Sequence, residues 1–290
     1  MSSGVSLRRE AEAQAGALPG LLLAAEQLAA TVQMGGHGRR RAGAGEEFWQ
    51  YRPALAGDSL RFVDWRRSAR SDVQYVRDRE WQLAQSLSLW ADGSASMRFS
   101  GAKGRVTKAD RARLLALALA VLAVRAGERV GLGPLAPPRP GRAQLMTLAA
   151  LLSAEGTGDY GLPEVAGVPG RARAAFLSDF FGDIDAIKSA VGQLSDRGVS
   201  GVLLQVVDPA EEEFPFDGRT IFESMSGSLR HETREARDLR DRYRARLAAR
   251  RDRLEALART AGWQVSVHRT DAPAAAALLW LYAALERGRG

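Results

Sequence analysis

From Trp81 to the end of the chain, short apolar runs of strand length alternate with longer segments of helical periodicity. The runs that we expect to form strands are residues 81–91, 128–135, 171–180, 200–208 and 263–271. The segments that we expect to form helices are residues 108–126, 143–154, 183–198, 229–261 and 274–287, with a long excursion at 209–227. Such alternation is typical of a mostly parallel sheet with helices on both faces. We therefore predict an α/β fold with a doubly wound, Rossmann-like sheet.

The first 80 residues have a different character. Apolar residues at helical spacing over residues 18–32 predict one helix. A glycine-rich and arginine-rich segment, Gly35–Gly45, interrupts this periodicity. Residues 46–80 are short, turn-rich and aromatic, which predicts strands or hairpins. We expect residues 1–80 to form an appendage of one helix and a β-hairpin region, and residues 81–290 to form the α/β domain.

The composition limits the classes of protein to consider. Hydrophobic residues make up 46% and charged residues 26% of the 290 residues, as in ordinary globular proteins. The absence of cysteine excludes disulfides and thiolate metal sites. No stretch approaches the ~20 apolar residues that a membrane-spanning helix needs, and the start of the chain lacks the features of a secretory signal. We expect a cytoplasmic protein with no membrane span.

The net charge of +7 raises nucleic acid as a partner, but the pattern of charges does not favour it. Only Lys103, Lys108 and Lys188 among the 41 basic residues are lysines, a bias that often reflects a GC-rich genome. Acidic residues are interleaved with the arginines, four apart on the long helix expected at 229–261, as on a solvated helix face. The segment "GAKGRVTK" lacks the order of a phosphate-binding loop. Nucleic-acid binding is therefore the least favoured hypothesis.

Polar residues follow the ends of two expected strands. Asp92, Ser94 and Ser96 come after the first strand, and Ser178-Asp179 ends the third. A glycine-bounded loop between them, "AEGTGDYG", carries Thr157 and Asp159. Carboxyl ends of parallel strands share one rim of a sheet, so these loops can converge. They offer carboxylate and hydroxyl oxygens, which suit Mg²⁺, Mn²⁺ or Ca²⁺, whereas the three histidines show no ligand spacing.

The sequence "DGSASM" after an apolar strand resembles the Asp-x-Ser-x-Ser motif of von Willebrand factor A-type domains. In those domains a metal-ion-dependent adhesion site is built from this loop, a threonine loop and an aspartate loop. The resemblance implies a metal site with Asp92, Ser94 and Ser96 in the first loop and Asp179 in the third. Thr157 is assigned to the second loop by its order along the chain. Thr147 is the alternative, although it falls within an expected helix.

The text before this motif resembles the bacterial domain-of-unknown-function 58 family. Its Gly-Asp, Arg-x-x-Asp-Trp and Ser-Ala-Arg elements are here Gly57-Asp58, Arg61 to Trp65 and Ser68 to Arg70. Many relatives begin with membrane-spanning helices, and this chain resembles a soluble subtype without them. The family is associated with neighbouring AAA+ ATPases of the MoxR type, so the resemblance implies a chaperone or assembly system. It implies no enzymatic activity.

Our interpretation is a non-enzymatic, divalent-metal-dependent binding module that captures an Asp or Glu carboxylate of a protein partner. The main alternative is a Mg²⁺-dependent hydrolase in which Asp92 or Asp179 activates water. That chemistry needs a poised acid–base group beside the metal, and the sequence offers no clear candidate. A nucleic-acid-binding protein remains the third hypothesis.

Overall fold

The computed structural model describes residues 20–32, 48–53, 75–79, 85–156, 158–223 and 230–287. The chain divides into two compact units, of which the smaller lies within Arg39–Gln85. In that unit β1 (Phe48–Pro53) pairs antiparallel with β2 (Tyr75–Arg79), as expected for its β-rich sequence. The helix of residues 20–32 belongs to the larger unit. The boundary between residues 80 and 81 that we predicted from the sequence stays a prediction.

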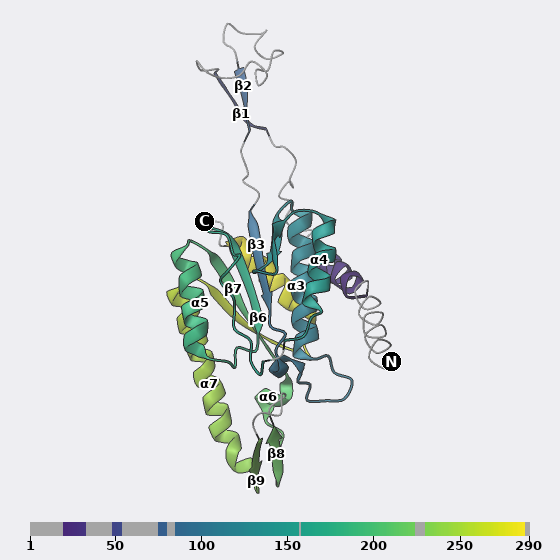
Figure 1. The fold of residues 1–290 in the computed structure, drawn as a ribbon, viewed down its shortest axis with the longest axis vertical. Helices are drawn as coiled ribbons and strands as arrows, with labels where there is room; N and C mark the ends of the chain where they lie inside the picture. Colours follow the sequence, from purple (N-terminus) through teal and green to yellow (C-terminus); the bar gives the residue numbers. More distant parts are fainter. Residues whose placement is uncertain are drawn as a thin grey trace, which may run out of the picture. The chain divides into compact units, whose positions relative to one another are not determined.

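The larger unit contains a six-stranded sheet (Figure 1). In spatial order its strands are β10 (Gln264–Arg269), β7 (Ser200–Val207), β6 (Arg173–Ser178), β3 (Ser86–Ala91), β4 (Arg129–Leu132) and β5 (Ala136–Arg139). All neighbouring pairs are parallel except β4 and β5, which are antiparallel. This arrangement confirms the predicted α/β fold with a mostly parallel sheet.

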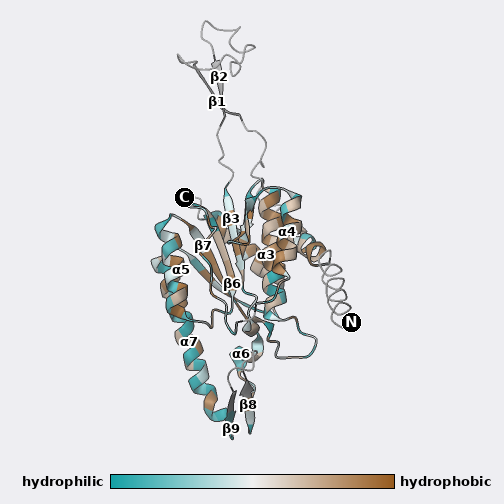
Figure 2. Cartoon of the chain, viewed as in Figure 1, coloured by the Kyte–Doolittle hydropathy of each residue, from teal (hydrophilic) through white to brown (hydrophobic). Residues whose placement is uncertain are grey.

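Helices cover both faces of the sheet (Figure 1). One face packs against α3 (Lys108–Arg125), α4 (Arg142–Leu152), α8 (Ala274–Arg287) and the helix of residues 20–32. The other face packs against α5 (Ile184–Asp196) and α7 (Arg237–Thr260). Figure 2 shows α7 to be mostly hydrophilic, whereas every residue of α3 from Leu115 to Ala123 is buried. None of the described helices combines the length and apolar character needed to cross a membrane.

Alternate residues of the central strands enter two separate cores. All six residues of β6 are buried. Ala175 and Leu177 face the core under α3, whereas Ala174 and Phe176 face the core under α5 and α7. A strand covered on both sides is expected to be apolar at successive positions, and "RAAFLS" largely follows that pattern.

The order of the strands creates a switch point between β3 and β6. After β3 the chain forms α3 and adds β4 on one side, and α4 then leads to β6 on the opposite side of β3. In open α/β sheets, ligands bind beyond the carboxyl ends of the strands at such a point. Beyond this rim lie α6 (Pro209–Glu213), β8 (Thr220–Glu223) and β9 (Arg230–Thr233) (Figure 1).

Two of the expected elements differ from the structure. The helix expected at 229–261 begins only at Arg237, because Arg230–Thr233 pairs antiparallel with β8 as strand β9. The strand expected at 128–135 ends at Leu132, where the chain turns into β5. β5 contains two prolines, which suit its position at the edge of the sheet because proline cannot donate to a ladder.

The packing of β7 leads to a prediction for two glycine-to-alanine substitutions, one on β7 and one on α5. A Cβ at Gly201 would lie 2.7 Å from the Trp263 ring and 2.8 Å from the Ala174 carbonyl. We expect Gly201→Ala to lower the free energy of unfolding by about 2 kcal/mol through overpacking. A Cβ at Gly192 on α5 would meet nothing within 4 Å, so Gly192→Ala should raise it by roughly 0.5–1 kcal/mol. Urea denaturation of both variants checks this, and equal effects would contradict the packing described.

Candidate functional site

Asp92 directly follows β3, and neutral donors fix both of its carboxylate oxygens. Oδ1 accepts a hydrogen bond from the Ser94 N–H at 2.8 Å, and Oδ2 accepts one from the Ser178 hydroxyl at 2.7 Å. The Asp92 N–H donates to the Leu177 carbonyl at 2.9 Å, which extends the pairing of β3 with β6. Gly161 approaches so closely that a Cβ there would lie 2.2 Å from Oδ1. The buried Asp92 carboxylate is therefore held in one position.

Ser94 and Ser96 bring two hydroxyl groups to the turn that follows Asp92. Ser94 is the N-cap of η2 (Ala95–Arg98), a short 3₁₀ helix. The Oγ atoms of Ser94 and Ser96 lie 3.3 Å apart. Two oxygen ligands in adjacent positions on Mg²⁺ would be about 3 Å apart, given its octahedral geometry. The spacing of the two hydroxyls therefore suits one small divalent cation.

The loop that carries Thr157 lies against this turn. Three backbone hydrogen bonds of 2.9 Å join the two segments, from the N–H groups of Gly156, Ala95 and Ser96 to the carbonyls of Gly93, Gly158 and Asp159, respectively. Thr157 itself lies outside the described residues, so its assignment as a ligand stays a prediction. Thr147, the alternative, is exposed on α4, where its hydroxyl donates to the Ala143 carbonyl at 3.2 Å.

Asp179 follows β6, and a charged donor holds its buried carboxylate. Oδ2 accepts a hydrogen bond from the Lys108 ammonium at 2.9 Å, and Oδ1 accepts one from the Phe181 N–H at 2.9 Å. The Gln205 side chain donates to the Asp179 carbonyl, also at 2.9 Å. Asp179 is therefore paired with a full positive charge, whereas the hydrogen bonds to the Asp92 carboxylate come from uncharged groups.

Lys108 is the first residue of α3, and its side chain is fully buried. Its ammonium also donates to Glu211 at 2.5 Å, and it lies 5.8 Å from the centre of the Phe99 ring and 5.0 Å from that of Phe181. Burial lowers the pKa of Lys108, but the charges of Asp179 and Glu211 outweigh burial, so the pKa is raised. Burial also raises the pKa of Glu211, although Lys108 acts in the opposite direction.

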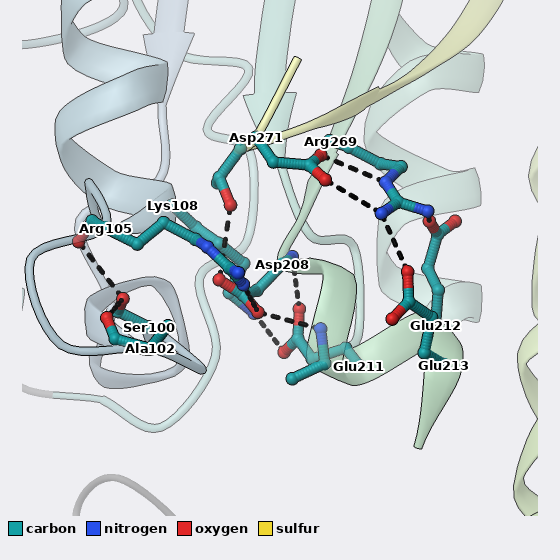
Figure 3. Close-up of polar contacts among 12 residues, drawn as sticks. Ser100, Ala102, Arg105, Lys108, Asp208, Glu211, Glu212, Glu213, Arg269 and Asp271 are labelled. Carbon is teal, nitrogen blue, oxygen red and sulfur yellow. Dashed lines mark hydrogen bonds and ion pairs between the residues drawn. The ribbon is translucent and has the colours of Figure 1, made fainter. Parts of the chain in front are cut away.

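A chain of polar contacts continues from Lys108 to the ends of the next two strands (Figure 3). Glu211 accepts a hydrogen bond at 2.9 Å from the N–H of Asp208, which follows β7 and caps α6. The Asp208 carboxylate accepts hydrogen bonds from Arg105 at 3.0 Å, the Ala210 N–H at 2.8 Å and the Thr270 hydroxyl at 3.2 Å. Burial raises the pKa of Asp208, but hydrogen bonds from Ala210 and Arg105 contribute to a net lowering.

Arginines of α7 support the same rim from the other face of the sheet. Arg250 donates to the Phe180 carbonyl at 2.7 Å and also to the Gly182 carbonyl. Arg251 donates to Glu212 of α6. These side chains bind the loop after β6 and the short helix after β7, so part of the basic charge on α7 serves internal contacts.

The residues of this rim fit a divalent cation only in part. The described part of the chain contains no group of three or more acidic or histidine side chains placed to hold a metal ion. A cation at this rim would therefore depend on serine hydroxyls together with Asp92. Ser94, Ser96 and Asp92 fit that role by their proximity, and Asp179 would have to share its carboxylate with Lys108.

The sequence reasoning missed Lys108, Glu211 and Asp208. One signal was present, because Asp208-Pro-x-Glu211 has the spacing of a helix capping box, which the structure contains. Lys108 lies in the segment "GAKGRVTK", whose local pattern suggests no more than an incomplete phosphate loop. Its contact with Asp179 spans 71 residues of sequence, and local patterns do not reveal such a contact.

His268, a buried residue of β10, leads to a prediction about how stability depends on pH. Burial and the nearby Arg111, which lies 3.0 Å from the His268 Nε2 atom, lower the pKa of His268 to about 4. The unfolded chain therefore takes up a proton near the ordinary pKa of about 6.5, while the folded chain does not. We expect stability to be lost as the pH falls from about 6.5 towards 4. The loss should be smaller in His268→Gln, as measured by urea denaturation at pH 7 and 4.5, and identical losses would contradict the assignment.

Comparison with known proteins bears on the family. The chain matches the family model described as "Protein of unknown function DUF58" over residues 50–253, and no curated protein matches it. Among solved structures it is similar to the crystal structure of the conserved hypothetical protein BatB from Bacteroides thetaiotaomicron. The identity is 16%, the match covers 70% of this chain and 98% of that one, and the TM-score is 0.38. Because the family match spans more than half of the 290 residues, the chain belongs to the DUF58 family of proteins of unknown function.

Proposed function

We propose that this protein is a divalent-metal-dependent binding module of the von Willebrand factor A type, which captures a carboxylate of a protein partner. The observation that carries the proposal is the convergence of Asp92, Ser94 and Ser96 at the switch point between β3 and β6. The Thr157 loop, which is hydrogen-bonded to the same turn, supports it.

Each described residue of the turn has a separate role in this proposal. Ser94 and Ser96 offer neutral oxygens, which fill coordination positions without cancelling the charge of a cation. Asp92 supplies one negative charge and is held in place by Ser178 and by the Ser94 N–H. A bound divalent cation would supply an open position that favours an outside carboxylate. The proposal involves no catalytic step.

The partner that we propose is an AAA+ ATPase of the MoxR type, or a substrate presented by such an ATPase. Support for this comes from membership of the family together with the association with these ATPases that the resemblance implies, since the site itself selects only for a carboxylate. The recognised group would be an Asp or Glu side chain exposed on the partner, and the bound metal would be Mg²⁺, Mn²⁺ or Ca²⁺.

Removal of the two hydroxyls tests the metal. We expect the Ser94→Ala/Ser96→Ala variant to bind Mn²⁺ and Mg²⁺ at least about tenfold more weakly than the wild type, because two oxygen ligands are lost. Isothermal titration calorimetry on the full chain measures this. Ser189→Ala, which changes an exposed serine on α5, is the matched control and should bind like the wild type. Equal affinity of the double variant and the wild type would exclude this site.

Chelation of the metal tests the partner. We expect the tagged wild-type protein to retain a MoxR-type ATPase subunit from native extract in the presence of Mg²⁺ and to lose it in EDTA. The Ser94→Ala/Ser96→Ala variant should fail to retain the subunit in either condition, whereas Ser189→Ala should behave like the wild type. Mass spectrometry of the bound fraction identifies the subunit. Retention that is insensitive to both EDTA and the double substitution would contradict metal-dependent docking.

A further inference from the structure

The two aspartates of the rim are electrostatically unequal. The hydrogen bonds to the Asp92 carboxylate come from an amide N–H and a serine hydroxyl, which leave its negative charge uncompensated. Asp179 accepts one of its hydrogen bonds from the Lys108 ammonium, at 2.9 Å. The motif resemblance assigns Asp92 and Asp179 alike as metal ligands and does not reveal this difference in charge.

Lys108 is built into the structure rather than mobile on its surface. Its side chain is fully buried, and the Phe99 and Phe181 rings lie beside the ammonium. Glu211 shares the ammonium with Asp179 and is itself fixed by the N–H of Asp208 at the start of α6. A buried charge that has lost its partner costs several kcal/mol. Asp179 and Glu211 therefore hold the Lys108 ammonium in a fixed place within the rim.

We propose that Lys108 sets the balance of the site between metal and carboxylate: its ammonium, held by Asp179, weakens the binding of a divalent cation and strengthens the binding of the partner's carboxylate. This inference rests on the proposed function. Removal of the ammonium makes the rim one unit more negative and frees the Oδ2 atom of Asp179. Both changes favour a cation, and the added negative charge disfavours an incoming carboxylate.

An electrostatic role of Lys108 can be distinguished from a merely structural one, because it predicts that loss of Lys108 changes metal binding and carboxylate binding in opposite directions. If Lys108 only held the rim together, its loss would weaken both metal and carboxylate binding. If it sets the charge, its loss tightens the first and weakens the second. Glu211→Gln offers the reverse change, because it removes a negative charge that shares the same ammonium and leaves the rim one unit more positive.

The experiment measures water-proton relaxation of the full chain titrated with Mn²⁺ and then, at saturating Mn²⁺, with acetate as the carboxylate probe. For Lys108→Met we expect Mn²⁺ to bind about tenfold more tightly and acetate about tenfold more weakly than in the wild type. For Glu211→Gln we expect the opposite shifts, with Mn²⁺ bound more weakly and acetate more tightly than in the wild type. Lys188→Met, which removes an exposed lysine on α5, is the matched control and should leave both affinities unchanged.

The outcomes distinguish this inference from the function on which it rests. If the wild type binds Mn²⁺ no better than Ser94→Ala/Ser96→Ala, the metal site fails, and the role of Lys108 fails with it. If the wild type binds through the serines but Lys108→Met and Glu211→Gln shift both affinities in the same direction, or not at all, only the role of Lys108 is overturned. Should Lys108→Met not fold, the reverse shift in Glu211→Gln decides the question, because that variant retains the ammonium.

Discussion

The polar rim depends on the contact between two neighbouring strands, β3 and β6, at the point where the connections change direction. The Asp92 N–H continues the ladder to Leu177, and the next residue of β6, Ser178, donates its hydroxyl to the Asp92 carboxylate. These two hydrogen bonds fix the point at which β3 ends and the turn that contains Ser94 and Ser96 begins. The turn is held in addition by its backbone hydrogen bonds to Gly156, Gly158 and Asp159.

The alternation of strands and helices made the sheet and both of its cores predictable, because period-2 and period-3.6 patterns are local properties of the sequence. The polar ends of β3 and β6 were predictable for the same reason. The antiparallel turn into β5 and the late start of α7 were not, since both depend on pairing between segments. The sites of Gly57-Asp58, Arg61 to Trp65 and Ser68 to Arg70 lie outside the described residues, as does Thr157.

Lys108 occupies a position that is unfavourable for a cation when α3 is considered alone. It lies in the first turn of the helix, where the helix dipole favours negative charge. Burial adds to that cost. Asp179 after β6 and Glu211 on α6 offset both, and Asp208 connects Glu211 to the ends of β7 and β10. Through these contacts, the Lys108 ammonium at the start of α3 connects the ends of β6, β7 and β10, which are far apart in the sequence.

The edge strand β5 has a consequence for how the molecule behaves at high concentration. Its sequence is "APPR", and because successive N–H groups of a strand point to opposite sides, one of the two adjacent prolines removes a donor that would face a strand arriving from outside. An exposed strand edge is otherwise a template for pairing with another chain. At this edge of the sheet, the missing donor therefore disfavours the addition of a strand from a second copy and so counts against edge-to-edge pairing there.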